Sequence, residues 1–152
     1  MILAGCTAIT TNDYEATAKA TYTWQVHYST SPSRRQERIE TFAANSLINR
    51  NGQKPAGAVI GPDDRELWWP AMPPRPTLDE IEQRQKPGEM ASQPELLQTV
   101  DYQMTYRTGN QTTTLPTNYQ VYRQVAKVYP SRSPLHLTLG VNDASVEQAT
   151  LD

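Results

Sequence analysis

Residues 16–28 alternate strictly between apolar and polar side chains. The apolar positions are Ala16, Ala18, Ala20, Tyr22, Trp24, Val26 and Tyr28, and the residues between them are Thr17, Lys19, Thr21, Thr23, Gln25 and His27. Because successive side chains of a strand point to opposite faces of a sheet, this pattern predicts a long β-strand with one buried and one exposed face. Such a strand requires partner strands and a cover for its apolar face.

Other segments carry strand patterns as well. Residues 100–107 and 135–141 alternate in the same way, and a Gly109-Asn110 turn signal follows the first of them. A short hairpin is expected over residues 58–69. Residues 118–130 carry apolar side chains on both faces, which predicts a central or bulged strand. The predicted fold class is therefore α+β, a mostly antiparallel β-sheet with one or two short helices.

One helix has a clear start and stop. Thr77 with Glu80 three residues later forms a capping-box pattern, which predicts a helix over 78–86 that ends at Pro87-Gly88. Residues 34–48 allow two interpretations. They form either a helix capped by Ser33, which we favour, or a strand over 38–44 that pairs back onto the first strand, with Asn51-Gly52 marking a later turn.

The length of 152 residues suits one domain. We predict a single globular domain over 13–142. Residues 1–12 are expected to be a signal-peptide remnant and a polar tether that stand apart from the fold. Residues 143–152 are expected to form a polar C-terminal tail.

Charge and motif content argue against several functions. The net charge of −2 comes from mixed acidic and basic residues, with no basic stripe that would favour nucleic acid. No run approaches the roughly 18 apolar residues of a membrane span. Glycine-rich phosphate loops and a G-x-S-x-G elbow are absent from the sequence. These features predict that the chain is not an enzyme and uses no cofactor.

The two histidines, His27 and His136, fall on the polar side of their strands. A metal site would require the fold to bring them together with Asp101 or Glu15. The sequence spacing does not support this, so we expect solvent-facing histidines and no metal.

The single cysteine, Cys6, follows Leu3, Ala4 and Gly5. This tetrapeptide resembles the lipobox of bacterial lipoproteins, although the basic and apolar leader that such a signal needs is not in the sequence. The resemblance implies a diacylglycerol thioether on Cys6 and cleavage after Gly5. It also implies anchoring on the extracytoplasmic side of a bacterial envelope membrane. Without lipidation, the expected location is the cytoplasm.

The segment around the second aromatic cluster combines two Trp with a run of prolines. Rigid aromatic residues are common at binding hot spots, so this segment predicts a protein-interaction surface. Its residues are Trp68, Trp69, Met72, Pro73, Pro74, Arg75 and Pro76. The other interpretation, which we favour, is that the two Trp cover the domain's own core and the prolines close a long connection.

The predicted function is that of an envelope-tethered, non-enzymatic accessory or structural module, with a protein partner of unknown identity and no nucleic acid. A small-ligand-binding domain is the alternative. It would use Tyr22, Trp24 and Tyr28, or the face over 102–106, as a stacking wall.

Overall fold

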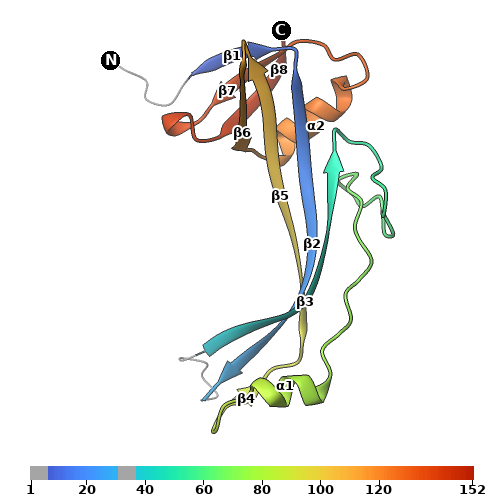
Figure 1. Cartoon of the computed structure of the whole chain (residues 1–152), viewed down its shortest axis with the longest axis vertical. Helices are drawn as coiled ribbons and strands as arrows, with labels where there is room; N and C mark the ends of the chain where they lie inside the picture. The colour runs from blue at the N-terminus through green and yellow to red at the C-terminus, as the bar shows by residue number, and fades with distance from the viewer. Residues whose placement is uncertain (1–6, 31–36) are drawn as a thin grey trace.

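A long, narrow sheet gives the molecule its elongated shape in the computed structural model, which describes residues 7–30 and 37–152 (Figure 1). A compact group of short elements lies at one end of this sheet and a short helix at the other. The lipobox-like residues 3–6 lie outside the described residues, as does Ser33. The elements are β1 (Ala8–Thr11), β2 (Tyr14–Ser29), β3 (Glu37–Arg50), α1 (Leu78–Arg84), β4 (Met90–Ala91), β5 (Glu95–Thr108), β6 (Gln111–Pro116), α2 (Tyr119–Val128), β7 (Leu135–Leu139) and β8 (Val146–Leu151), with a short 3₁₀ turn at Val141–Asp143.

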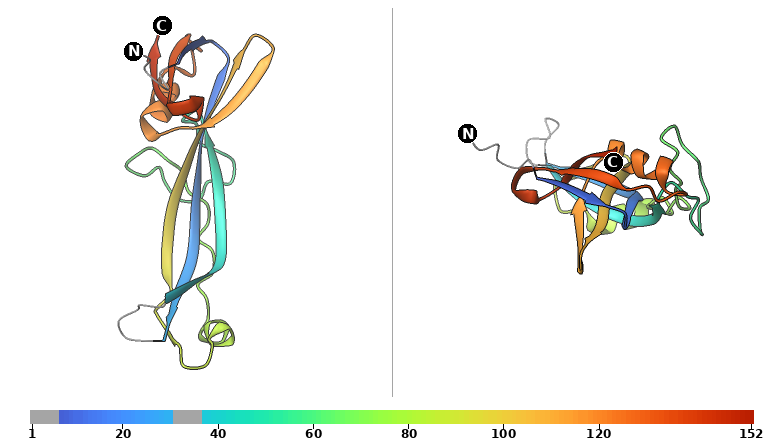
Figure 2. Two further views of the ribbon diagram at one scale, coloured as in Figure 1. Left: turned by 90° about the vertical axis from the view of Figure 1, so that its left-hand side faces the viewer. Right: turned by 90° about the horizontal axis from the view of Figure 1, so that it is seen from above.

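All strand pairs are antiparallel, and the strands form two sheets. The larger sheet has the order β3-β2-β5-β6, and β4 pairs with the last residues of β2. The smaller sheet has the order β1-β7-β8. Figure 2 shows β2 between β3 and β5 along the narrow part of the molecule. The predicted α+β class with a mostly antiparallel sheet is confirmed.

The apolar face of β2 is buried along its whole length, as its alternation predicts. Three hydrophobic clusters follow one another along this inner face. The first contains Ala16 and Ala18 with α2 and the small sheet, the second contains Tyr22, and the third contains Val26 and Tyr28. At about 3.3 Å per residue, a strand of this length extends roughly 50 Å, which is too long for one compact core.

Residues 37–50 form strand β3, so the helix favoured for 34–48 is wrong for the residues that the structure describes. The strand interpretation is correct, since β3 pairs with β2 from Thr17↔Arg50 to Ser29↔Glu37. A helix at these residues would have left the backbone groups along one edge of β2 without partners. Strand β3 pairs with these groups. Asn51 (φ 53°) and Gly52 (φ 78°) form the expected turn at the end of β3. A Cβ on Gly52 would lie 2.5 Å from the Ala126 Cβ, so α2 approaches this turn closely.

Residues 119–128 form helix α2 and not the predicted central strand. Asn118 is its N-cap, and its side chain accepts a hydrogen bond from the Val121 amide at 3.0 Å. The buried residues Val121, Tyr122, Val125 and Val128 follow a helical spacing. The apolar residues on both strand faces were therefore one face of a helix.

Both ends of the described chain belong to the fold, which corrects two predicted boundaries. The expected tether over 7–12 contains β1, which pairs with β7 from Ala8↔Thr138 to Thr11↔Leu135. The expected free tail over 143–152 contains β8, which pairs with the other side of β7. Strand β7 has three buried leucines and needs two neighbours, which these end segments provide. The folded unit therefore extends beyond 13–142.

Other predicted elements are confirmed. Helix α1 has the complete Thr77–Glu80 capping box and ends at Arg84, two residues before the predicted end. Residues 58–69 form a short hairpin through the Ile60↔Trp69 bridge, and β5 and β6 form a hairpin across the Gly109-Asn110 turn. Neither helix in the described part of the chain is long and apolar enough to cross a membrane.

The cap of α2 provides a test of this element. We expect Asn118→Ala to lower the free energy of unfolding by about 0.5–2 kcal/mol, because the Val121 amide loses its side-chain acceptor. Chemical denaturation measures the change. The matched control is Gln120→Ala, an exposed position in the same helix, which should change stability by less than about 0.5 kcal/mol. Equal effects of the two substitutions would contradict the capping role.

Candidate functional site

The second tryptophan of the predicted interaction segment packs inside its own domain. Trp69 is 6% exposed, and its ring lies 4.8 Å from the ring of Tyr22, centroid to centroid. Its indole N–H donates to Asp63 Oδ2 at 2.8 Å. A buried indole needs such an acceptor, so this residue is a core residue and not a contact residue.

The prolines that follow also lie against the sheet. Pro73 and Pro76 are buried, and the carbonyl of Pro73 accepts a hydrogen bond from the Trp24 indole at 2.8 Å. Farther along, the Tyr28 hydroxyl donates to the carbonyl of Ile81 at 2.8 Å. The segment therefore covers the apolar face of β2. This corrects the predicted interaction surface for Trp69, Pro73 and Pro76.

The remaining residues of that segment reach solvent. Met72 is 51% exposed, and Pro74 and Arg75 are exposed. Trp68 is half-buried, with the Lys54 ammonium 4.9 Å from its ring centroid. Only this part of the predicted surface is available to a partner.

The predicted stacking walls are covered. Tyr22, Trp24 and Tyr28 are 4%, 8% and 0% exposed, and Tyr106 is 4% exposed. The connecting segment, residues 51–77 between β3 and α1, and α1 itself fill the space above the first three rings. Burial raises the pKa of Tyr22 and Tyr28. These rings stabilise the fold and offer no open face for a ligand.

The two histidines lie in different sheets. His27 is on β2, with Nδ1 2.7 Å from Glu37 Oε1 and Nε2 3.3 Å from Glu95 Oε2. His136 is on β7, and its Nδ1 lies 3.3 Å from the Thr10 hydroxyl. Among the described residues, no group of three or more His, Cys, Asp or Glu side chains has metal-binding geometry. Of the candidate third ligands, Glu15 pairs with Arg50 at 2.5 Å, and Asp101 lies opposite Lys19 in the pairing of β2 with β5.

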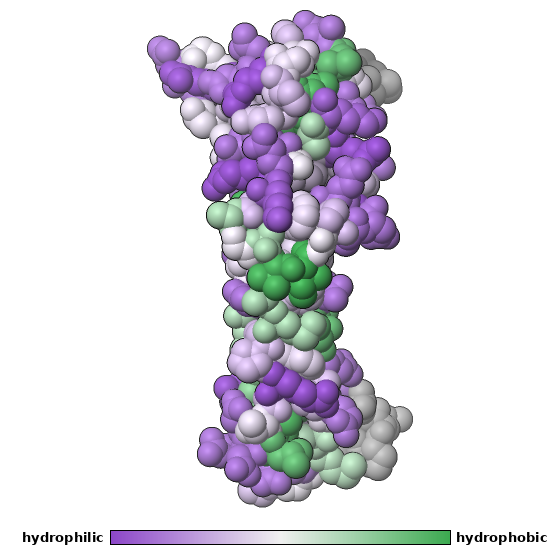
Figure 3. Space-filling model, turned by 90° about the vertical axis from the view of Figure 1, so that its right-hand side faces the viewer, coloured by the Kyte–Doolittle hydropathy of each residue, from purple (hydrophilic) through white to green (hydrophobic). Residues whose placement is uncertain are grey.

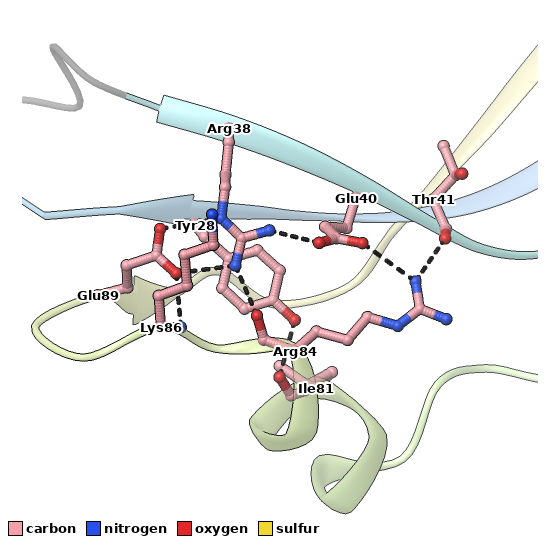
Figure 4. Close-up of polar contacts among 8 residues, drawn as sticks. All are labelled: Tyr28, Arg38, Glu40, Thr41, Ile81, Arg84, Lys86 and Glu89. Atoms are coloured by element: carbon pink, nitrogen blue, oxygen red, sulfur yellow. Dashed lines mark hydrogen bonds and ion pairs between the residues drawn. The ribbon is translucent and has the colours of Figure 1, made fainter.

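A charged cluster fastens α1 and the following loop to β3 (Figure 4). Arg38 donates to both oxygens of Glu89, at 3.0 and 2.8 Å, and also pairs with Glu40. Its guanidinium lies 4.4 Å from the centroid of the Tyr28 ring. The Arg84 side chain donates to the Thr41 carbonyl at 2.8 Å. Bidentate pairing fixes the relative orientation of the two side chains. These contacts therefore hold α1 and the loop after it against residues 38–41 of β3.

The hydrogen bonds of this cluster shift the pKa values of its charged groups. The hydrogen bonds from Arg38 hold the pKa of Glu89 below its ordinary value of 4.5, and the same contacts raise the pKa of Arg38. The Glu89 side chain is only 7% exposed. Its charge is therefore part of how the loop is held to the sheet.

The candidate contact surface is the outer edge of β3. Asn51 donates its amide to the Ala16 carbonyl at 2.9 Å, so its backbone faces β2. Because backbone direction alternates along a strand, Arg50, Ile48 and Ser46 direct their backbone groups to the opposite side. Within the described chain, no other segment forms a backbone hydrogen bond with residues 44–48 on that side.

Apolar side chains accompany this edge. Ile39 and Ile48 of β3 are 53% and 43% exposed. The neighbouring segment adds Val59, Ile60 and Met72, and Asn45 holds it to β3 through a 2.9 Å hydrogen bond to the Ala71 carbonyl. Figure 3 looks onto the side of the molecule where this segment covers the sheet, and it shows an apolar patch at mid-height. The sequence prediction named Met72 but missed Ile39 and Ile48, because residues 34–48 were interpreted as a helix.

No family model, curated protein or solved structure matches this chain.

The packing of Trp69 is testable. We expect Trp69→Ala to lower the free energy of unfolding by about 3–5 kcal/mol, because it removes a buried aromatic ring from the second cluster. Urea denaturation measures this change. Met72→Ala, in the same segment but half-exposed, is the control and should change stability by about 0.5 kcal/mol or less. A small effect of Trp69→Ala would contradict the role of this segment as the cover of β2.

The Glu89 carboxylate gives a pH-dependent prediction. A group with a depressed pKa contributes stability that is fully present above its ordinary pKa, here 4.5, and is lost as pH falls through the folded-state value. Between about pH 6 and about pH 3, the wild type should therefore lose more stability than Glu89→Gln. Urea midpoints across this range measure the difference. Glu82→Gln, on the exposed surface of α1, should parallel the wild type. Parallel curves for wild type and Glu89→Gln would contradict this prediction.

Proposed function

We propose that this chain is a non-enzymatic, membrane-tethered interaction module, anchored through lipid on Cys6 and contacting a protein partner along the edge of β3. The observation that carries the proposal is the edge of β3 at residues 44–48, which pairs with no other segment in the described part of the chain, together with the exposed apolar side chains nearby (Figure 3). An edge strand presents a row of unpaired N–H and C=O groups that another strand can extend.

Natural sheets usually protect such edges with charge, proline or cover. Residues 41–48 of β3 contain no charged residue and no proline. The bulge near Phe42 and Ala43 bends the strand, yet Ala44, Asn45 and Ser46 remain exposed. An uncharged, exposed edge with flanking apolar side chains is favourable for a protein contact.

The interior of the molecule is consistent with a structural role. The connecting segment and α2 fill the apolar face of β2 with the protein's own side chains. An elongated sheet of this kind can hold a contact edge away from an anchored end. The lipid tether itself rests on the lipobox-like residues Leu3–Cys6 of the sequence.

The anchor is tested by expressing the gene with its upstream DNA in a bacterial host. Mass spectrometry should find Cys6 as an acylated N-terminus in the membrane fraction, and Cys6→Ser should move the protein to the soluble fraction. An unmodified Cys6, or no change of fraction in Cys6→Ser, would overturn the lipid anchor.

The contact edge is tested with a photo-reactive residue in the same cells. At position 48 it should give a defined covalent adduct. At position 97 it should give several times less, because Leu97 has a matched exposure of 42% but lies on β5. The adduct at position 48 should decrease in Ser46→Pro, which removes an outward N–H from the edge. Equal adducts at both positions, or none at position 48, would overturn the β3 edge as the contact surface.

A further inference from the structure

We infer that the partner strand at the β3 edge is β3 of a second copy of this chain, in a two-fold antiparallel pairing. This inference shares with the proposed function only the use of the β3 edge as a contact surface. Two features of β3 carry it: the bulge near its centre, and complementary residues at equal distances on either side of the bulge.

The bulge changes which residues face outward. Thr23 pairs with Ala44 but Gln25 pairs with Thr41, so β3 has one extra residue at this point. The outer face of the sheet is the one that carries the polar residues of β2, such as His27. Before the bulge, Glu37, Ile39 and Thr41 lie on this face. After it, the outer face carries Ala44, Ser46, Ile48 and Arg50. The exposure pattern follows this change, with Ile39 and Ile48 exposed and Asn49 buried.

This change of phase makes a symmetric pairing possible. In an antiparallel pair, residues directly opposite must lie on the same face of the sheet. A two-fold axis between positions 43 and 44 places odd-numbered residues opposite even-numbered ones. In a regular strand that would set the outer face against the inner face. The bulge removes this conflict, because outer residues are odd-numbered before it and even-numbered after it.

The residues that meet in this register are complementary. Ile39 lies opposite Ile48 of the second copy, so two exposed apolar side chains cover each other. Thr41 lies opposite Ser46 of the second copy, and Glu37 lies opposite Arg50 of the second copy. Each contact occurs twice because of the symmetry. Cross-strand pairs of these three kinds stabilise sheets.

Charges already present in each copy fit the same register. Glu37 also contacts His27, and Arg50 pairs with Glu15, so the new pairs would extend polar contacts already present on the outer face. On the inner face, Glu40 keeps its partners Arg38 and Arg84 within its own chain. The backbone is in phase as well. The Thr41 carbonyl points away from β2 and accepts one hydrogen bond from Arg84, so its second lone pair would accept from the Ser46 amide of the second copy. Ser46 also directs its backbone away from β2.

The other free edge of the sheet does not offer such a pairing. Residues 95–101 of β5 lie beyond the end of β6 and also lack a neighbour in the described chain. A symmetric pairing centred on Gln98 would place Glu95 opposite Asp101 of the second copy. Like charges directly opposite destabilise a sheet, so self-pairing favours the β3 edge.

The apolar patch lies near the proposed axis. Asn45 is next to the centre of the pairing and holds the carbonyl of Ala71. Met72, the next residue after Ala71, is 51% exposed. A two-fold contact uses the same surface on both copies, and the buried core of such a contact is more apolar than its rim.

The decisive experiment is disulfide trapping with purified chains in a Cys6→Ser background. One chain carries Ile39→Cys and the other carries Ile48→Cys. Residues directly opposite lie roughly 5.5 Å apart between Cα atoms when they exchange hydrogen bonds, within the span of a disulfide. Mild oxidation should cross-link the mixture of the two variants. Either variant alone should cross-link at least about tenfold less, because equal positions in the two copies are nine residues, roughly 30 Å, apart.

Association without cysteine is the second measurement. Sedimentation of the Cys6→Ser chain should give a dimer, and Ser46→Pro should give a monomer with an unchanged far-ultraviolet spectrum. Ser46→Thr keeps the backbone N–H and should remain dimeric. Glu37→Arg and Arg50→Glu should each weaken the dimer, and the double variant should restore it, since the two charges exchange places across the axis.

The outcomes separate this inference from the proposed function. Cross-linking of either single variant by itself would indicate another register and overturn the pairing. A monomer at all concentrations with no cross-link in the mixture would also overturn it. In that case a photo-adduct from position 48 to a different protein would still support the β3 edge as a contact surface. An adduct at twice the chain mass is expected if the second copy is the partner.

Discussion

The burial of one face of β2 is the constraint on which the rest of the structure depends. Seven apolar side chains from Ala16 to Tyr28 lie on that face, and no single compact core can cover them. Their size changes along the strand. Ala16 and Ala18 leave room for α2 near one end, whereas Tyr22, Trp24 and Tyr28 need a thinner cover farther along. A different segment of the chain therefore covers each part of the apolar face of β2.

The cover over the aromatic half is irregular chain rich in proline, and its chemistry suits the rings beneath it. Proline has no backbone N–H, so a proline segment buries fewer donors that need partners. Its carbonyl groups remain free to accept hydrogen bonds. The Trp24 indole uses the carbonyl of Pro73 in this way. The Tyr28 hydroxyl is paired instead by the carbonyl of Ile81 in α1, so irregular chain and a short helix together satisfy these two buried aromatic side chains.

The sequence correctly predicted those elements whose signals are local. The alternation of β2, the capping box of α1 and the Gly109-Asn110 turn depend on neighbouring residues alone, and the structure confirms them. The failures came from tertiary context. Strand β3 was misread because its bulge breaks the period of two, and α2 because Val121, Tyr122, Val125 and Val128 fit two strand faces as well as one helical face. The polar ends of the chain gave no local sign that β7 would pair with both.

The same reasoning explains why the candidate contact surface was only partly predictable. Aromatic and proline content drew attention to residues 68–76, and most of that segment turned out to serve the interior. Exposed edges carry no compositional signal, because an edge is defined by the absence of a neighbouring strand. Ile39 and Ile48 become interesting only when their register with β2 is known.

A membrane tether would change how much affinity such an edge needs. Free in solution, the cross-strand pairs at the two β3 edges must offset the translational and rotational entropy lost on association, so the dimer forms at high chain concentration. Chains anchored to one surface meet at a much higher effective concentration, so the same contacts would keep a larger fraction of them paired. In the proposed arrangement, a lipid on Cys6 would supply concentration, and the uncharged stretch at 41–48 of β3 would supply selectivity through the bulge that lets its two halves match.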